Sequence, residues 1–249
     1  MAGEASALVF QMLESTALNA IPAPARNLFL VLLSAAAGCV DAIAFIHVGV
    51  FPANMTGNSV VLATNLLHPA SGAAILSALA LLGFCAGAAA SARMVRSAEH
   101  AWSHRTNIAL LGAAALVLGA AAAIPFTGDR YMALIILATA SAMGIQSAAV
   151  QQLGIAGVAT VFMTGTLTTA VSRFVGGVQE RMAGRLPLEK SPWLPALTWS
   201  AYFLGAFLGG LHRILHTPLP FALPGILILG VALASGWCLR RGPACKQGT

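Results

Sequence analysis

The sequence predicts an all-α polytopic membrane protein with six transmembrane helices, arranged as two inverted three-helix repeats that each contain a short re-entrant half-helix. Three observations support this prediction: an apolar composition, six long apolar blocks, and a short motif that occurs once in each half. Of the 249 residues, 58% are hydrophobic and 8% are charged, and the mean hydropathy is +0.84. A soluble globular protein has about 25% charged residues. We therefore expect lipid rather than water around most of this chain.

The six apolar blocks are each long enough to cross the hydrocarbon core, which needs about 20 helical residues. They are 28–48, 72–92, 107–126, 131–152, 193–213 and 219–239. The N-terminal segment lacks a basic stretch followed by an apolar core and a cleavage site, so we expect a cytoplasmic arm and not a signal peptide. The predicted division is an arm at 1–26, a first repeat at 27–127, a second repeat at 128–241 and a cytoplasmic tail at 242–249.

Two further apolar segments, 56–67 and 164–176, are too short to cross the membrane as helices. Each begins at the end of a repeated motif, because GVFPANMTG at 49–57 matches GVATVFMTG at 157–165 in five of nine positions. A chance match is conceivable in so apolar a chain. The equivalent placement of the copies, after a long block and before a short one, favours an internal duplication of the kind found in transporters.

Basic residues predict the orientation of the spans, because cytoplasmic loops have an excess of Lys and Arg. With six spans and both short segments re-entrant, eleven Lys and Arg residues lie on the side of the termini and two on the other side. If both short segments crossed fully, the loop that holds Arg93, Arg96 and Arg105 would move to the other side. We therefore expect both termini to be cytoplasmic. Each half then has three spans, so the two halves enter the membrane in opposite directions.

The two re-entrant tips are the predicted solute site. A helix that starts inside the membrane has N–H groups without helical partners, and its positive dipole end favours an anion or a carbonyl oxygen. Asn54 or Thr56 is placed to cap the first short helix, and Thr164 the second. The residues predicted to bind solute are Asn54, Thr56, Gly57, Asn58, Gln151, Thr164, Gly165 and Thr166. The alternative is that side chains cap each helix fully and the tips bind nothing.

Asp41 is the only acidic residue within a predicted span, and we expect it to couple transport to a proton or a cation. It lies near the middle of 28–48. A carboxylate in hydrocarbon is costly, so acids within spans usually face a cavity and serve a function. The alternative is a structural hydrogen bond from Asp41 to a neighbouring helix.

Polar and small residues on other spans offer partners for these groups. Ser147 and Gln151 share one face of the fourth span, where an amide either binds solute or joins helices. Small-residue faces on the second span, with Gly83, Gly87 and Ala90, and on the fifth span permit a homo-oligomer but do not require one. One face of the fifth span contains Thr198, Tyr202, Gly205, Gly209 and His212. Two glycines four residues apart on that face predict close helix packing.

Several functional classes lack support in the sequence. The net charge is +6 and the pI about 9.8, but the basic residues lie in loops between apolar blocks, which argues against nucleic-acid binding. The four cysteines show no C-x-x-C spacing, so we expect free thiols and no metal site. We find no P-loop, no G-x-S-x-G, no H-E-x-x-H and no paired carboxylates, so we expect no cofactor and no enzymatic activity.

GCVDA at 38–42 and VFPANMTGN at 50–58 together form the pattern G-x-x-D followed by F-x-x-N-x-T-G-N. This pattern resembles the YoaK-like family of small bacterial inner-membrane proteins, a domain of unknown function with about six spans. The resemblance covers residues 25–241 and implies a bacterial inner membrane, but it supplies no substrate, cofactor or mechanism. In the second half, Phe162 replaces Asn54 and Thr166 replaces Asn58, so we expect the two tips to be unequal.

Our leading interpretation is a secondary transporter or channel for a small polar solute, with an anion as the favoured class. The solute would bind at the midplane, and its transport would be coupled to protons through Asp41. Its partners would be the lipid bilayer and the solute. A second interpretation is a non-transporting scaffold or accessory subunit, which predicts a closed, dry contact between Thr56 and Thr164. A third is a membrane-embedded enzyme, which needs a second titratable group near Asp41, and the spans offer only His47. A polar cavity between the tips would distinguish the first interpretation from the second.

Overall fold

The computed structural model describes residues 21–67, 72–95, 102–127, 131–155, 158–161, 163–182 and 193–241. Within these ranges the regular structure is helical. The helices are α2 (Ala23–Val48), α3 (Met55–Leu66), α4 (Ala73–Val95), α5 (His104–Thr127), α6 (Met132–Gln151), α7 (Met163–Met182), α8 (Leu194–Leu215) and α9 (Ala222–Arg241). Most of the predicted arm, the whole predicted tail, and Gly157 and Phe162 of the repeated motif lie outside the described residues.

Six of the described helices are long and apolar enough to cross a membrane: α2, α4, α5, α6, α8 and α9. They confirm the six predicted spans, with bounds that differ by a few residues. The largest early difference is at α2, which begins at Ala23 rather than at residue 28. Pro24 stands in the first turn, where its missing N–H would have had no helical partner, so it starts the helix instead of blocking it.

The other two described helices, α3 and α7, correspond to the two short apolar segments. α3 has 12 residues, as predicted. α7 has 20 residues and continues past the predicted end near Gly176. Gly176 and Gly177 lie at that predicted end, but among the described glycines only Gly49 and Gly154 have positive φ, so this pair stays in the helical region. A glycine weakens a helix by about 1 kcal/mol but ends it only when it adopts the left-handed conformation.

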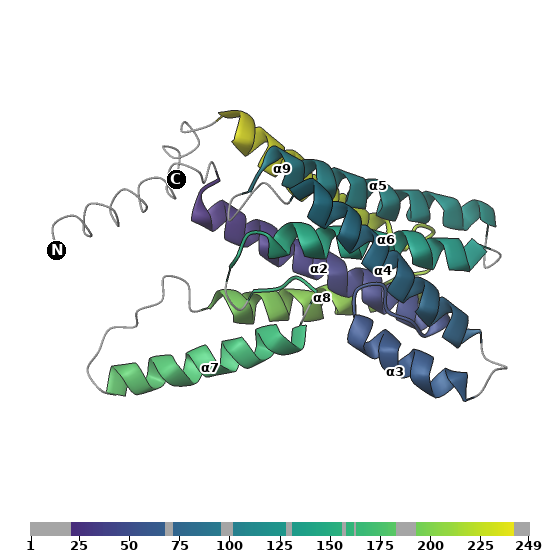
Figure 1. The fold of residues 1–249 in the computed structure, drawn as a ribbon, viewed down its shortest axis with the longest axis horizontal. Helices are drawn as coiled ribbons and strands as arrows, with labels where there is room; N and C mark the ends of the chain where they lie inside the picture. The colour runs from purple at the N-terminus through teal and green to yellow at the C-terminus, as the bar shows by residue number, and fades with distance from the viewer. Residues whose placement is uncertain are drawn as a thin grey trace.

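The long helices pack in pairs around α2 and α6 (Figure 1). The most extensive contacts join α4 to α6 and α2 to α8, and α5 packs against both α9 and α6. In α2 and α6, 67% of the residues in the most apolar 18-residue stretch of the helix are buried, against 22–39% in the other four spans. α2 and α6 are therefore the centre of the bundle, and the other spans present more apolar surface to the bilayer.

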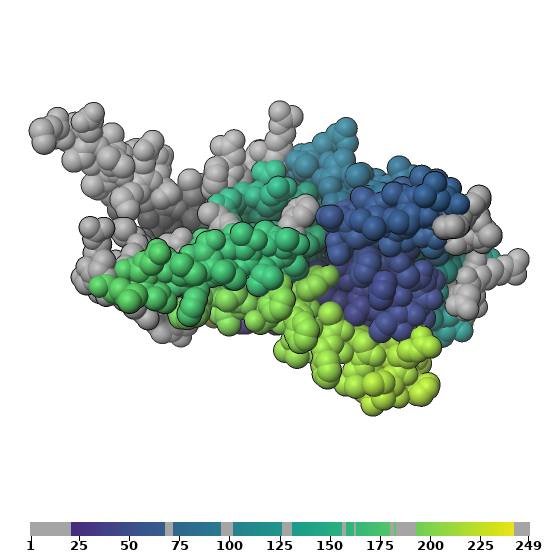
Figure 2. All heavy atoms as spheres, turned by 90° about the horizontal axis from the view of Figure 1, so that it is seen from below, coloured from purple at the N-terminus to yellow at the C-terminus, as the bar shows by residue number. Residues whose placement is uncertain are grey.

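α3 and α7 lie on one side of this bundle, where α3 packs on α4 and α7 on α8. Figure 2 views that side, with α7 (green) and α3 (dark blue) lying along it and α2 (purple) and α8 (yellow-green) visible between and beside them. In Figure 1 the two helices start near the middle of the long axis and diverge towards opposite ends. The described residues therefore place two helix N-termini near the centre of the molecule.

Glycines let the two main helix pairs approach at backbone distance. A Cβ at Gly38 of α2 would meet the carbonyl oxygen of Tyr202 and the nitrogen of Ala206 on α8. A Cβ at Gly144 of α6 would meet the carbonyl oxygen of Phe84 and the nitrogen of Ala88 on α4. Small residues at such contacts are the usual way in which membrane helices pack closely.

The partner helices contribute glycines to the same contacts. A Cβ at Gly205 would meet the carbonyl of Ala35, and one at Gly87 the carbonyl of Ser141. The close packing predicted at Gly205 and Gly209 is thus confirmed, with α2 as the partner. Gly83 and Gly87 of α4 pack against α6 within the chain, whereas Ala90 of the same predicted face is exposed.

Replacing an interface glycine with alanine tests this packing. We expect Gly205→Ala and Gly87→Ala each to destabilise the protein by about 1–3 kcal/mol, the usual cost of forcing extra methyl groups into a packed interior. The added carbon meets backbone atoms, which cannot rotate away. The effect is measured as a lower Tm for thermal unfolding in detergent, where the remaining fraction of monodisperse protein is recorded at each temperature.

Gly112→Ala and Gly230→Ala are the matched controls, because no atom lies within 4 Å of a Cβ built at either helical position. These two variants should unfold at or slightly above the wild-type Tm, since alanine favours the helix. Equal Tm values for all four variants would contradict the proposed role of the glycine contacts.

Candidate functional site

The loop after α2 turns back along the helix that it leaves. Gly49 ends α2 in the left-handed conformation, with φ 73°. Asn58 in the first turns of α3 is fully buried and braces the loop: its Nδ2 donates to the carbonyl oxygen of Phe51 at 2.5 Å and its Oδ1 accepts from the N–H of Phe51 at 2.8 Å. Asn54 caps α3 by accepting from the N–H of Gly57 at 3.1 Å. Of the two residues that the sequence offered as caps, Asn54 is therefore the one that caps α3.

The loop before α7 has a brace of the same kind. Thr166 Oγ1 donates to the carbonyl oxygen of Ala159 at 3.3 Å and accepts from the N–H of Ala159 at 3.3 Å. In both loops a buried side chain bonds both backbone groups of the residue seven positions earlier. Thr164, predicted as a cap, is instead the second residue of α7, and the residue before the helix lies outside the described residues.

Asp41 connects the first loop to α8. The residue is 2% exposed. Its Oδ1 accepts from the N–H groups of Ala53 at 2.6 Å and Asn54 at 3.4 Å, and its Oδ2 accepts from the hydroxyl of Tyr202 at 2.6 Å. The interhelix hydrogen bond that the sequence left open as an alternative is therefore present. The carboxylate also holds the backbone of the first tip, which neither interpretation of Asp41 included.

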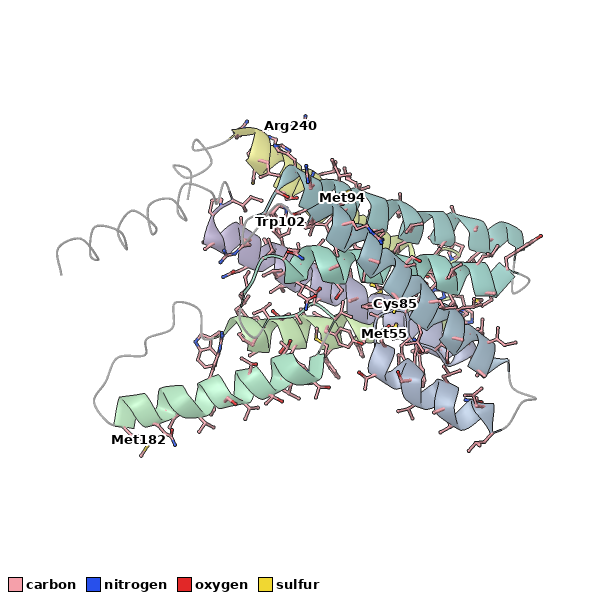
Figure 3. All side chains as sticks on the ribbon, viewed as in Figure 1. Met55, Cys85, Met94, Trp102, Met182 and Arg240 are labelled. Atoms are coloured by element: carbon pink, nitrogen blue, oxygen red, sulfur yellow. The ribbon has the colours of Figure 1, made fainter. Side chains whose placement is uncertain are left out.

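A cavity of about 210 Å³ lies between the starts of α3 and α7. We call it the tip cavity, and its lining residues are Ala53, Asn54, Met55, Thr56, Val161, Met163, Thr164, Gly165 and Tyr202. Figure 3 shows Met55 at the central end of α3, and Met182 at the far end of α7. Both predicted tips contribute to the lining. Tyr202 was not predicted as a site residue, although it lies on the polar face of the fifth span, and that face was the available signal.

A second cavity, of about 330 Å³, lies on the other side of the start of α7. We call it the Thr160 cavity, and its lining residues are Ser147, Val150, Gln151, Gly154, Ile155, Val158, Ala159, Thr160, Gly165, Thr166 and Thr169. Gly165 lines both cavities, so the two adjoin at the first turn of α7.

The eight predicted solute-binding residues thus fall into three groups. Asn54, Thr56, Thr164 and Gly165 line the tip cavity, and Gln151, Gly165 and Thr166 line the Thr160 cavity. Gly57 and Asn58 line neither. Asn58 is occupied by its bonds to the loop, and a Cβ at Gly57 would lie 3.1 Å from the Phe51 ring and from the Asn54 amide. These two residues shape the first tip from within.

Comparison with known proteins finds a family and a relative that each match most of the chain. Residues 29–234 match a family described as "Protein of unknown function (DUF1275)". The chain is also 31% identical over 225 residues to the "UPF0700 transmembrane protein YoaK" of Bacillus subtilis (strain 168), a match that covers 84% of this chain and 94% of the relative. No solved structure matches the chain.

Removing the brace of the first loop tests the construction of the site. We expect Asn58→Ala to cost about 1–3 kcal/mol, because it leaves the N–H and the carbonyl of Phe51 without partners. Thr166→Val keeps the shape of its side chain and should cost less, since its two bonds are longer at 3.3 Å each. Thermal unfolding in detergent gives the order of Tm values, and hydrogen exchange of the peptides covering each loop locates the change.

Thr64→Val serves as the control for both variants. Thr64 is exposed on α3 and bonds only to carbonyl oxygens of its own helix turn, at Val60 and Val61. Its removal should leave both the Tm and the exchange of the loops unchanged. Faster exchange at the first loop in Thr64→Val than in Asn58→Ala would show that the brace is not what orders the tip.

Proposed function

The chain belongs to the DUF1275 family of membrane proteins, and we propose that it is a secondary transporter or channel for a small polar, anionic solute. The proposed solute site is the tip cavity, between Thr56 on α3 and Thr164 on α7. The observation that supports it most is the cavity itself, because both predicted tips contribute polar groups to one space of about 210 Å³. A scaffold or accessory subunit, the alternative, predicts a closed and dry contact at the same place.

Helix ends supply the affinity for an anion in this proposal. α3 and α7 both begin at the tip cavity, so the positive ends of two helix dipoles lie beside the solute. The hydroxyls of Thr56 and Thr164 and the amide of Asn54 add donors. Discontinuous helices with their N-termini at a central site are a common device of secondary transporters.

Asp41 and Tyr202 form the proposed proton-coupling pair. Tyr202 lines the tip cavity while its hydroxyl donates to Asp41, so the tyrosine lies between the solute and the carboxylate. A negative Asp41 would repel an anion in the cavity, and a proton taken up by Asp41 would remove this repulsion. The two events would then favour each other, which is the requirement for proton–anion symport.

We also propose that the two halves are inverted repeats, in which α2, α3, α4 and α5 correspond to α6, α7, α8 and α9. Under this exchange the α4–α6 contact becomes α8–α2, the α5–α6 contact becomes α9–α2, and the α3–α4 contact becomes α7–α8. The α5–α9 contact is unchanged by it. The smaller α4–α5 contact is the exception among the described residues, since α8 and α9 make no contact of that extent.

The glycine contacts support the same correspondence atom by atom. Gly38 meets the oxygen of Tyr202 and the nitrogen four residues on, and Gly144 meets the oxygen of Phe84 and the nitrogen four residues on. Gly38 and Gly144 are therefore equivalent, as are Tyr202 and Phe84. Asp41 follows Gly38 by three residues, and Ser147 follows Gly144 by three. The pair of Asp41 and Tyr202 thus corresponds to Ser147 and Phe84, so the proposed proton site has no second copy at the equivalent place.

The proposed orientation follows from the charges at the two ends of the bundle. Arg26, Arg105 and Arg240 lie at the end where α2 begins and α9 ends, whereas Arg213 lies at the opposite end. Figure 3 shows Arg240 at the same end as Met182 of α7. Because cytoplasmic loops are rich in Lys and Arg, we place the first end, with both termini, in the cytoplasm of a bacterium, and the bundle in its inner membrane.

Flux in proteoliposomes tests the proposal. We expect uptake of small labelled anions by the wild type, stimulated when the outside is more acidic than the lumen. Asp41→Asn keeps a carbonyl oxygen for the N–H of Ala53 but carries no exchangeable carboxyl proton, so uptake should lose its response to the pH gradient. Tyr202→Phe keeps the ring and loses the bond to Asp41, so it should weaken the response.

Ser59→Ala is the control variant, because Ser59 is exposed on α3 and bonds only to the carbonyl oxygen of Met55. It should transport like the wild type. The coupling role fails if Asp41→Asn leaves every gradient-coupled flux unchanged. The transport proposal fails if the folded wild type moves none of a broad panel of anions, with or without a gradient.

A further inference from the structure

The Thr160 cavity contains a buried polar group that the described protein leaves without a partner. Thr160 is 2% exposed, and its Oγ1 has no hydrogen-bond partner among the described residues. An unpaired buried hydroxyl destabilises a protein, so such a group usually bonds to water or to a ligand. The hydroxyl of Thr169 and the amide of Gln151 line the same space. The Thr160 cavity is therefore lined by polar side chains that can bind water or a ligand.

At the corresponding place in the first half, two aromatic rings stack against each other. Gln151 lies seven residues after Gly144, as Phe45 lies seven after Gly38. Ala159 is braced by Thr166 in the way that Phe51 is braced by Asn58. The Phe45 and Phe51 rings stack at 4.6 Å between centroids, 12° from parallel. Where the first half has two phenyl rings, the second half has an amide and a methyl group.

Because of this difference, the tip cavity has a polar cavity beside it in the second half and two aromatic rings at the corresponding place in the first half. The Thr160 cavity adjoins the tip cavity at Gly165 and lies beside the C-terminal end of α6. α6 ends on the side of the bundle where α2 begins (Figure 1). The stacked Phe45 and Phe51 lie at the corresponding place near the opposite end of the bundle, where α2 ends.

The charges around both cavities limit what they can accept. None of the described residues that line either cavity is charged. The available positive charge is that of two helix N-termini, each equivalent to about half an elementary charge. With Asp41 protonated, as the proposed coupling requires, these two ends together supply about one charge, which balances a monoanion and leaves a dianion half compensated in a low-dielectric site.

From these observations we propose that the Thr160 cavity is the entry vestibule of the tip cavity, open towards the side where α2 begins and selective for compact monoanions. The Phe45–Phe51 stack closes the matching path on the opposite side. Thr160, Thr169 and Gln151 would bond the anion or its hydration water on the way in. The inference rests on the proposed function for its anion, but the vestibule is tested without transport.

Charged thiol reagents test the vestibule directly. The full chain is prepared with its native cysteines, Cys39, Cys85, Cys238 and Cys245, replaced by alanine. Single cysteines are then placed at Thr169 and at its counterpart Val61, 108 residues earlier in the chain. Membrane-impermeant methanethiosulfonates bearing a sulfonate or a trimethylammonium group are applied from each side. The rates are divided by those of the same reagents with glutathione.

The vestibule predicts that Thr169→Cys reacts only from the side where α2 begins. The sulfonate reagent should be favoured by about tenfold or more relative to glutathione, because a positive cleft raises the local concentration of anions. Val61→Cys should be unreactive from both sides. An unreactive Thr169→Cys, reaction from the opposite side, equal rates for the two reagents or a preference for the cation would each overturn the inference.

Rebuilding the ring stack provides an independent check. Gln151→Phe with Ala159→Phe should slow the labelling of Thr169→Cys by about tenfold or more, since the two rings would fill the cavity. If that variant is not monodisperse, the reverse change is used: Phe45→Gln should make Val61→Cys reactive. Unchanged labelling in the folded variant overturns the correspondence between the two paths.

Uptake by the wild type separates this inference from the proposed function. Chloride, nitrate and acetate are compared with sulfate at equal ionic strength. Uptake of monoanions without sulfate is expected, and equal uptake of sulfate overturns the monoanion selectivity. If labelling follows the prediction and none of these anions is taken up, the transport proposal fails for them and the vestibule stands.

Discussion

The hydrogen bonds of the Asp41 carboxylate hold together the parts of the molecule from which the site is built. They join α2 to the backbone of the first tip at Ala53 and Asn54, and to α8 through the hydroxyl of Tyr202. A carboxylate at this depth is costly unless donors surround it. Three donors do so here, and two of them belong to a loop that would otherwise lack partners for its own backbone. The acid and the irregular loop therefore stabilise each other, and the position of α3 depends on both.

Backbone-close packing of α2 with α8 and of α4 with α6 makes this arrangement possible. Glycines on all four helices remove the side chains that would separate them. α3 and α7 are left on one side of the bundle, with their first turns at a shared cavity. In the first half of the chain, Phe45 and Phe51 stack against each other, whereas Gln151 and Thr160 of the second half line a second cavity beside the shared one.

Much of the fold could be predicted from the sequence, because lipid imposes simple constraints: long apolar blocks must be helices, and two glycines four residues apart indicate close packing. The choice of partner helix could not, since hydropathy does not encode it. The repeated Met-Thr-Gly located the two tips in the sequence. It did not show which polar residue of a tip holds the loop and which one lines the cavity. Asn58 is a brace whereas Thr56 lines the cavity, and both are polar residues at the start of one short helix. Tyr202 was missed as a site residue because its bond to Asp41 spans 161 positions in the chain. The extension of α7 past Gly176 was missed because a glycine's φ is not visible in sequence.

In the proposed mechanism, the two helix N-termini face a polar space that accepts an anion. A crystal structure of the wild type grown in bromide, with data collected at the bromine absorption edge, tests this claim most directly. We expect an anomalous peak in the space bounded by Thr56, Thr164 and Tyr202, or between it and Thr160. Tips in direct side-chain contact, with bromide bound only at the exposed ends of the bundle, would contradict it.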